Sequence, residues 1–296
     1  MFTSRGKLFA RDGIAVLVVA IFMFPLFWWG LTSFKPTSAI FDKDRVVFFD
    51  FQPTLVNYGV TLLGKSRSDL GTAEGNTFGV GGASSYDSRQ TILDSIIVAV
   101  GSTALTILLG VMAAYALSRL NFRWRQAYLN WILSQRFMPP IAIIVPIVFM
   151  FHYVGLRDTL LGLIFIDTLI NLPVAVLLMK SFFDDVPQEV DEAAMLDGAT
   201  RFQIFYKVIM PLVTGGMAAT AVLCFIFSWT EFLLSLFLTN SIRTLPVKIS
   251  TFVTSTGSEW GFISALGTSA VLPSFIFILL VQKQLVRGLT LGSLKD

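Results

Sequence analysis

Gly59, Gly64, Lys65 and Ser66 have the spacing of a phosphate-binding loop, whose backbone N–H groups and lysine hold a nucleotide. A separate apolar run that ends at Asp167 resembles the segment that supplies a magnesium-binding aspartate. Such a loop needs a buried strand before the glycines and a helix after the lysine, because the N–H groups of that helix cradle the phosphate. Here Ser66 is followed by a polar stretch without helical periodicity. The sequence therefore predicts that this chain binds no nucleotide.

A second pattern, between residues 184 and 211, predicts two helices joined by a tight turn. Pro187 suits the first turn of a helix, and the acidic residues that follow it suit the positive end of the helix dipole. Gly198 suits the left-handed position that ends a helix, and Thr200 is a candidate N-cap for the next one. Ala193 and Ala194 leave room for another surface to approach closely. The alternative is an amphipathic hairpin that has no partner and only links the apolar segments on either side of it.

Several polar residues interrupt apolar segments and are candidate substrate contacts, because polar groups inside a membrane are functional by default. They are Gln135, Arg136, Asp167, Asn171, Trp229, Thr230 and Glu231. Planar hydrogen-bonding groups beside an aromatic face suit a sugar, whereas Arg136 on the substrate path would suit an anionic group. If Arg136 pairs with Asp167 or Glu231, it carries no information on the substrate. Each of these residues has a competing interpretation, in which its side chain only joins neighbouring helices or anchors a helix at the membrane interface.

The composition indicates that membrane-spanning helices position these residues. Apolar residues make up 54% of the 296 residues, charged residues 14%, and the mean hydropathy is +0.73. One cysteine and one histidine exclude an intrachain disulfide and a histidine-cysteine metal site, and no catalytic constellation is evident. We predict an all-α polytopic membrane protein with six spans, each long enough for a bilayer. The predicted spans are Ile14–Phe34, Ile92–Leu117, Tyr128–Tyr153, Thr159–Lys180, Ile209–Leu238 and Gly261–Val286.

The distribution of Lys and Arg predicts the orientation of these spans, because short cytoplasmic loops carry most of the positive charge. With the N-terminus inside, the short outer loops contain only Arg157, Arg243 and Lys248. Both termini and the 184–211 segment are then cytoplasmic. The long segment 35–90 is an outer loop, rich in Gly, Ser and Asp between Gly71 and Ser88.

The 184–211 segment resembles the signature of permease subunits of binding-protein-dependent ABC importers. That signature is Glu-Ala-Ala, three residues, Gly, nine residues, and an aliphatic-x-aliphatic-Pro ending. It is met by Glu192, Ala193, Ala194, Gly198, Val208, Met210 and Pro211, with Val and Met in place of the usual Ile and Leu. Over nearly the whole chain the sequence resembles carbohydrate-uptake permeases of the type of the shorter maltose permease subunit. The matching segments include Asn57-Tyr58, Met138-Pro139-Pro140, 228–232 and 288–292.

The resemblance implies a single permease domain, 1–296, with the type I importer fold in the inner membrane of a bacterium. It also implies that the 184–211 loop docks into an ATPase subunit through Asp191, Glu192, Ala193, Ala194, Asp197, Gly198 and Arg201. ATP and Mg²⁺ would bind to the partner ATPase dimer and not to this chain. The other implied partners are a second, different permease subunit and a periplasmic binding protein. The cytoplasmic tail 288–296 would reach the ATPase interface.

The substrate and the energy source leave alternatives. We expect a neutral sugar or polyol, with an anionic sugar derivative as the alternative if Arg136 lines the path. A proton-driven transporter would instead use carboxylates such as Asp167 and Glu231 as a relay, and would not need the 184–211 loop. A membrane receptor or assembly protein would need no transport at all.

Overall fold

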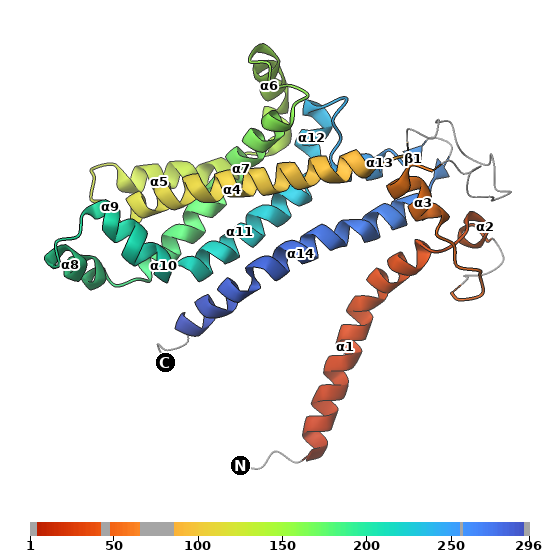
Figure 1. Cartoon of the computed structure of the whole chain (residues 1–296), viewed down its shortest axis with the longest axis horizontal. Coiled ribbons are helices and arrows are strands. Elements are labelled where there is room, and N and C mark those ends of the chain that lie inside the picture. Colours follow the sequence, from red (N-terminus) through yellow and green to blue (C-terminus); the bar gives the residue numbers. More distant parts are fainter. Residues whose placement is uncertain (1–4, 43–47, 66–85, 255–256, 293–296) are drawn as a thin grey trace. The chain divides into compact units, whose positions relative to one another are not determined.

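The computed structural model describes residues 5–42, 48–65, 86–254 and 257–292, and these are helical apart from loops and one short strand pair (Figure 1). The glycine-rich part of the segment that was predicted as an outer loop, 66–85, and the end of the predicted tail, 293–296, lie outside the described residues. The elements are α1 (Arg5–Thr32), α2 (Thr37–Ile40), α3 (Val56–Leu63), α4 (Arg89–Arg119), α5 (Arg125–Ser134), η3 (Gln135–Phe137), α6 (Pro140–Tyr153), α7 (Leu160–Asp184), α8 (Gln188–Leu196), α9 (Arg201–Gln203), η4 (Ile204–Ile209), α10 (Met210–Leu212), α11 (Thr214–Trp229), α12 (Leu233–Leu238), α13 (Leu245–Ser250), β1 (Val253–Thr254), β2 (Gly257–Ser258) and α14 (Trp260–Gly292).

Four helices, α1, α4, α7 and α14, are long and apolar enough to cross a membrane, which confirms four of the predicted spans. The third and fifth predicted spans are each divided by a sharp bend instead of forming one straight helix. The segment Tyr128–Tyr153 is divided between α5 and α6, which meet at 97°, and Ile209–Leu238 contains a 75° bend between α10 and α11. The prolines explain the first break: Pro139 and Pro140 have no N–H to donate, and Met138 before them is extended. Six crossings result if each bent pair is one span.

The chain folds into two compact units, and the larger one comprises residues 91–247 and 272–296. Its centre is formed by α4, α7 and α11. The first two run parallel, because Gly110 lies against Ala175 while Ser118, further along α4, bonds to Asp184 at the end of α7. Helix α11 runs the opposite way, with Gly216 against Phe182 and Ser228 bonded to Asn171.

Small residues set the spacing of these helices. A Cβ at Gly110 would lie 3.0 Å from that of Ala175, and one at Gly216 would lie 2.2 Å from the ring of Phe182. The close backbone approach at Gly110 is typical of helix pairs in membranes, where packing replaces the hydrophobic effect. Two clusters of buried apolar side chains fill the unit, one around Met179 and Phe183 and the other around Leu163 and Leu234.

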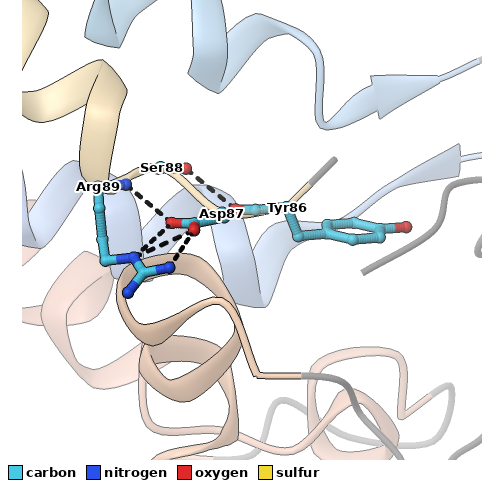
Figure 2. Close-up of polar contacts among 4 residues, drawn as sticks. All are labelled: Tyr86, Asp87, Ser88 and Arg89. Carbon is cyan, nitrogen blue, oxygen red and sulfur yellow. Dashed lines mark hydrogen bonds and ion pairs between the residues drawn. The ribbon is translucent and has the colours of Figure 1, made fainter. Parts of the chain in front are cut away.

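The smaller unit comprises residues 1–90 and 248–271. Asn57 of α3 donates two hydrogen bonds to the carbonyls of Ser33 and Lys35 and so fixes the turn after α1. The strands β1 and β2 pair antiparallel, with Val253 opposite Ser258. Figure 2 shows the start of α4, where the carboxylate of Asp87 accepts from the backbone N–H and the guanidinium of Arg89. This ion pair lowers the pKa of Asp87.

Candidate functional site

The turn predicted at Gly198 is confirmed, and its hydrogen bonds define the end of α8. Gly198 has a φ of +82° and donates to the carbonyl of Met195, while Ala199 donates to that of Ala194. This pair of bonds is a Schellman motif, which satisfies carbonyls that the last helical turn leaves open. Pro187 precedes α8 as its N-cap instead of lying in its first turn.

The helix that follows the turn begins with the predicted N-cap, Thr200. Its hydroxyl accepts from the N–H of Gln203, and the Gln203 side chain accepts from the N–H of Thr200, which completes a capping box. The chain then forms a π-helical turn, η4, before α10 and α11. Below, "the α8–η4 hairpin" denotes residues 188–209.

Arg119, at the end of α4, holds the α8–η4 hairpin in place. Its Nε lies 3.0 Å from Oδ2 of Asp191, and its Nη2 donates to the carbonyl of Val186 at 2.7 Å. The two charged side chains are only 7% and 13% exposed. Since Asp191 lies on the same face of α8 as Val190 and Ala194, which pack on the Met179–Phe183 cluster, this face is directed inward. Asp191 therefore contacts its own chain.

The opposite face of the α8–η4 hairpin is exposed and carries both apolar and charged groups. Leu196 is 89% exposed and Phe202 74% exposed. The other predicted docking residues, Glu192, Ala193, Asp197, Gly198 and Arg201, are also exposed, whereas Ala194 is half-buried. A hollow of about 160 Å³ between the hairpin and the end of α4 is lined in part by Glu192, Met195 and Arg201. This surface suits contact with another protein, because exposed apolar groups rimmed by charge mark interaction sites.

The predicted substrate contacts divide into a buried and an exposed group. In the buried group, Asn171 of α7 donates to the hydroxyl of Ser228 at 3.1 Å, and that hydroxyl also lies 2.7 Å from the hydroxyl of Ser102. Asp167 is 2% exposed, lies beside Ser228, and among the described residues its Oδ1 has no hydrogen-bond partner. We call these four residues the mid-span cluster. It ties α4, α7 and α11 together by polar contacts.

Two further candidates, Trp229 and Glu231, already form contacts within the chain, a ring stack and a set of hydrogen bonds. Trp229 is buried and stacks on Phe225 at an interplanar angle of 12°. The carboxylate of Glu231 accepts from the N–H groups of Leu234 and Ser235, at 2.7 and 3.0 Å, and so caps the start of α12. Neither of the two therefore presents a free aromatic face or a free carboxylate.

The exposed group consists of Gln135, Arg136 and Thr230. The guanidinium carbon of Arg136 lies 5.3 Å from the ring centroid of Phe227. Within the described part of the chain, Arg136 forms no ion pair. It therefore does not pair with Asp167 or Glu231, which was one of the alternatives. The hydroxyl of Thr230 donates to the carbonyl of Ile226.

The segment with the spacing of a phosphate-binding loop is a helix. Residues from Gly59 to Leu63 belong to α3, which ends at Gly64 in a left-handed conformation with a φ of +63°. The carboxylate of Asp87 lies so close to Gly64 that a Cβ there would meet it at 2.8 Å. A helix before the second glycine and an anionic neighbour are the opposite of what a phosphate requires.

Sequence reasoning missed two residues that organise the loops. One is Arg119, although a basic residue at the end of a span and an aspartate in the facing loop are a candidate pair. Asp158 was not singled out. Its carboxylate accepts from the backbone N–H groups of Asn240, Ser241 and Ile242, which joins the loops at the other end of α7. No sequence signal gives the partners of such a loop aspartate.

Known proteins resemble this chain over more than nine tenths of its length. Residues 106–291 match the family model described as binding-protein-dependent transport system inner membrane component. The chain is 34% identical, over 92% of its length and 89% of the relative, to the sulfoquinovosyl glycerol transport system permease protein of Agrobacterium fabrum. It is 32% identical to the trehalose transport system permease protein of Mycobacterium tuberculosis, over 94% of both chains.

A third relative and a solved structure agree with these matches. The chain is 30% identical to the trehalose/maltose transport system permease protein of Thermococcus litoralis, over 95% of this chain and 94% of the relative. Its fold matches a chain of a bacterial ABC transporter involved in the import of the acidic polysaccharide alginate. That match has a TM-score of 0.70 at 18% identity and covers 96% of this chain and 98% of the other.

Proposed function

This chain belongs to the family of binding-protein-dependent transport system inner membrane components, and on this premise we propose that it imports a sugar, polyol or sugar derivative with energy from a separate ATPase. It is a multi-pass membrane protein with the type I ABC importer permease fold, and it is a non-catalytic subunit of its transporter. The proposed substrate class is supported by the relatives in Agrobacterium, Mycobacterium and Thermococcus, whose names are those of sugar permeases.

The observation that carries the proposed mechanism is the α8–η4 hairpin. Its turn is fixed by Gly198, its inner face is tied to α4 through Asp191, and its outer face exposes Leu196 and Phe202. A rigid element with an exposed apolar face can receive a displacement from a partner and pass it to the spans. In this proposal the hairpin faces the cytoplasm, as do both termini, and docks on the ATPase.

The remaining partners follow from this proposal. ATP and Mg²⁺ bind to a dimer of ATPase subunits, and this chain binds neither. A second, different permease subunit completes the path, and a periplasmic binding protein delivers the substrate to the outward-open state. Closure of the ATPase dimer on ATP moves the α8–η4 hairpins and opens the paired permeases outward. A proton-driven mechanism would have no use for the hairpin.

Replacement of Gly198 by aspartate tests the proposal. Left-handed backbone costs a residue with a Cβ about 1–2 kcal/mol, and the added carboxylate stands on the proposed docking face. We expect Gly198→Asp to abolish ATP-dependent sugar uptake by proteoliposomes and to weaken co-purification of the ATPase, while membrane insertion stays normal.

The chain provides a matched control in Gly155, which ends α6 with a φ of +72° and the same pair of hydrogen bonds, from Gly155 to His152 and from Leu156 to Phe151. A Cβ at either glycine would meet nothing within 4 Å, so the two aspartate variants carry the same backbone strain. Gly155→Asp should leave uptake largely intact. Full uptake in Gly198→Asp, or in membranes without any ATPase subunit, would refute the proposed function.

A further inference from the structure

Arg136 occupies an unusual position, at the break of the third span. It lies in η3, between α5 and α6, where these helices meet at 97°. Its side chain is exposed and its guanidinium lies over the ring of Phe227. A guanidinium held on an aromatic face is preorganised, and the edge of its fork can still donate two parallel hydrogen bonds.

The depth of Arg136 follows from two helices of the larger unit. Phe227 lies thirteen residues after the start of α11 at Thr214, a rise of about 20 Å. Its neighbour Ser228 bonds to Asn171, which lies near the midpoint of the 25-residue α7. The guanidinium therefore lies well inside a hydrocarbon core of about 30 Å. An arginine without an ion pair is costly at this depth when it faces lipid, so we infer that it faces water or a bound anion.

The same break contains a second positive feature, the start of α6. This helix has 14 residues and no side chain caps its N-terminus. Pro140 is the first helical residue and lacks an N–H, while the N–H of Ala142 is bonded to the carbonyl of Pro139. The N-terminus of a helix carries about half a positive charge, and half-helices that begin inside a membrane direct this charge toward anionic substrates.

We propose that the break from Gln135 to Pro140 recognises an anionic group, a carboxylate, sulfonate or phosphate, on the transported sugar derivative. Arg136 donates a bidentate pair of hydrogen bonds to this group, and the N-terminus of α6 adds a favourable dipole. Thr230, three residues beyond Phe227 on the same side of α11, accepts a hydroxyl of the sugar. This inference rests on the proposed transport function and names the substrate class within it.

The test measures uptake into proteoliposomes that contain the complete transporter and its binding protein. The probes are methyl glucoside, trehalose and the derivatives of both that carry a carboxylate, sulfonate or phosphate at carbon 6. The wild type should import one or more of the anionic probes. Arg136→Gln should raise the apparent KM for those probes by about 10- to 100-fold, because it removes charged hydrogen bonds. Arg136→Lys keeps the charge but cannot donate two parallel hydrogen bonds, so its apparent KM should lie between those of the wild type and Arg136→Gln.

The control is Arg157→Gln, the same change in an exposed arginine of the loop before α7, which should leave KM within twofold of the wild type. Import of neutral probes alone by the wild type would overturn the anion site and leave the proposed function standing. Equal loss of neutral and anionic uptake in Arg136→Gln, or loss of the ATPase from that variant, would also overturn it, since Arg136 would then be a contact between subunits. A wild-type complex that imports no probe and whose ATPase responds to none would refute the proposed function itself.

Discussion

Asp158 shows how one side chain can join two loops. It has a φ of +58°, which is uncommon for a residue other than glycine, although aspartate tolerates this conformation better than most residues. The conformation directs its carboxylate at residues 240–242, where it accepts three backbone N–H groups and the hydroxyl of Ser241. The loop before α7 and the loop after α12 are thereby joined through a single anion.

Because of these hydrogen bonds, the free energy of unfolding of the protein depends on pH in the acidic range. The Ser241 hydroxyl, followed by the backbone N–H groups, lowers the pKa of Asp158 from an ordinary 3.8 to about 2. The contribution of Asp158 to the free energy of unfolding is then complete above about pH 4 and is lost as the pH falls through 2. Thermal unfolding in detergent between pH 5 and pH 2 should show this loss. Asp158→Asn should flatten the profile, and Ser241→Ala should flatten it partly. An unchanged slope in Asp158→Asn would contradict the assignment.

At the scale of elements, the pair of Arg119 and Asp191 decides whether α8 moves with α4. Removal of one partner leaves the other charge largely buried, which costs about 3 kcal/mol in buried pairs. We expect Arg119→Gln to accelerate hydrogen exchange of the α8 amides and to lower uptake per ATP hydrolysed. The exchanged pair, Arg119→Asp with Asp191→Arg, should restore part of both, since the bond to Val186 remains lost. Arg11→Gln is the control, because Arg11 and Asp12 form an ion pair whose two side chains are both exposed. Unchanged exchange in Arg119→Gln would exclude the coupling role.

The elements also show how far the sequence determines the structure. Capping chemistry predicts Gly198 and Thr200 correctly because both effects are local, between residues three to five positions apart. A proline in the sequence does not tell whether a helix continues or ends there. Pro146 and Pro173 lie inside continuous helices, whereas Pro139 and Pro140 mark the start of a new helix, α6. The difference arises from the number of consecutive N–H groups lost and from tertiary contacts of α6, such as those with α12.

The predicted site residues show the same limit. Glu192 and Asp197 were expected on the docking face and are exposed, whereas Asp191 turns inward because a helix places it with Val190 and Ala194. Helical periodicity contains that information. The stacking of Arg136 on Phe227 joins residues ninety-one positions apart, and no local rule predicts it.

At the scale of the whole molecule, the larger unit has two distinct ends. Helix α7 connects them, from Leu160 near the Asp158 contacts to Asp184 near the α8–η4 hairpin. If the hairpin is cytoplasmic, residues 240–242 are periplasmic. The single cysteine, Cys224, is fully buried, so the chain offers a low background for labelling of introduced cysteines.

Labelling with a membrane-impermeant maleimide tests this orientation. Asn240→Cys should react in spheroplasts, where the outer face is accessible, and Asp197→Cys should react only in inverted vesicles. Both positions are exposed in the chain alone, so in membranes without the ATPase subunits a difference in labelling reports sidedness and not burial. The reverse pattern would place the hairpin in the periplasm, out of reach of ATP.

The two broken spans have a consequence for the surrounding lipid. Helix α6, with 14 residues, is about 21 Å long and α11, with 16, about 24 Å, so each alone is shorter than a hydrocarbon core of about 30 Å. A bilayer adapts to short helices by thinning locally, at a cost that rises with acyl chain length. We therefore expect the lipids beside α6 to be compressed, so that membrane thickness acts on the break from Gln135 to Pro140 without any ligand.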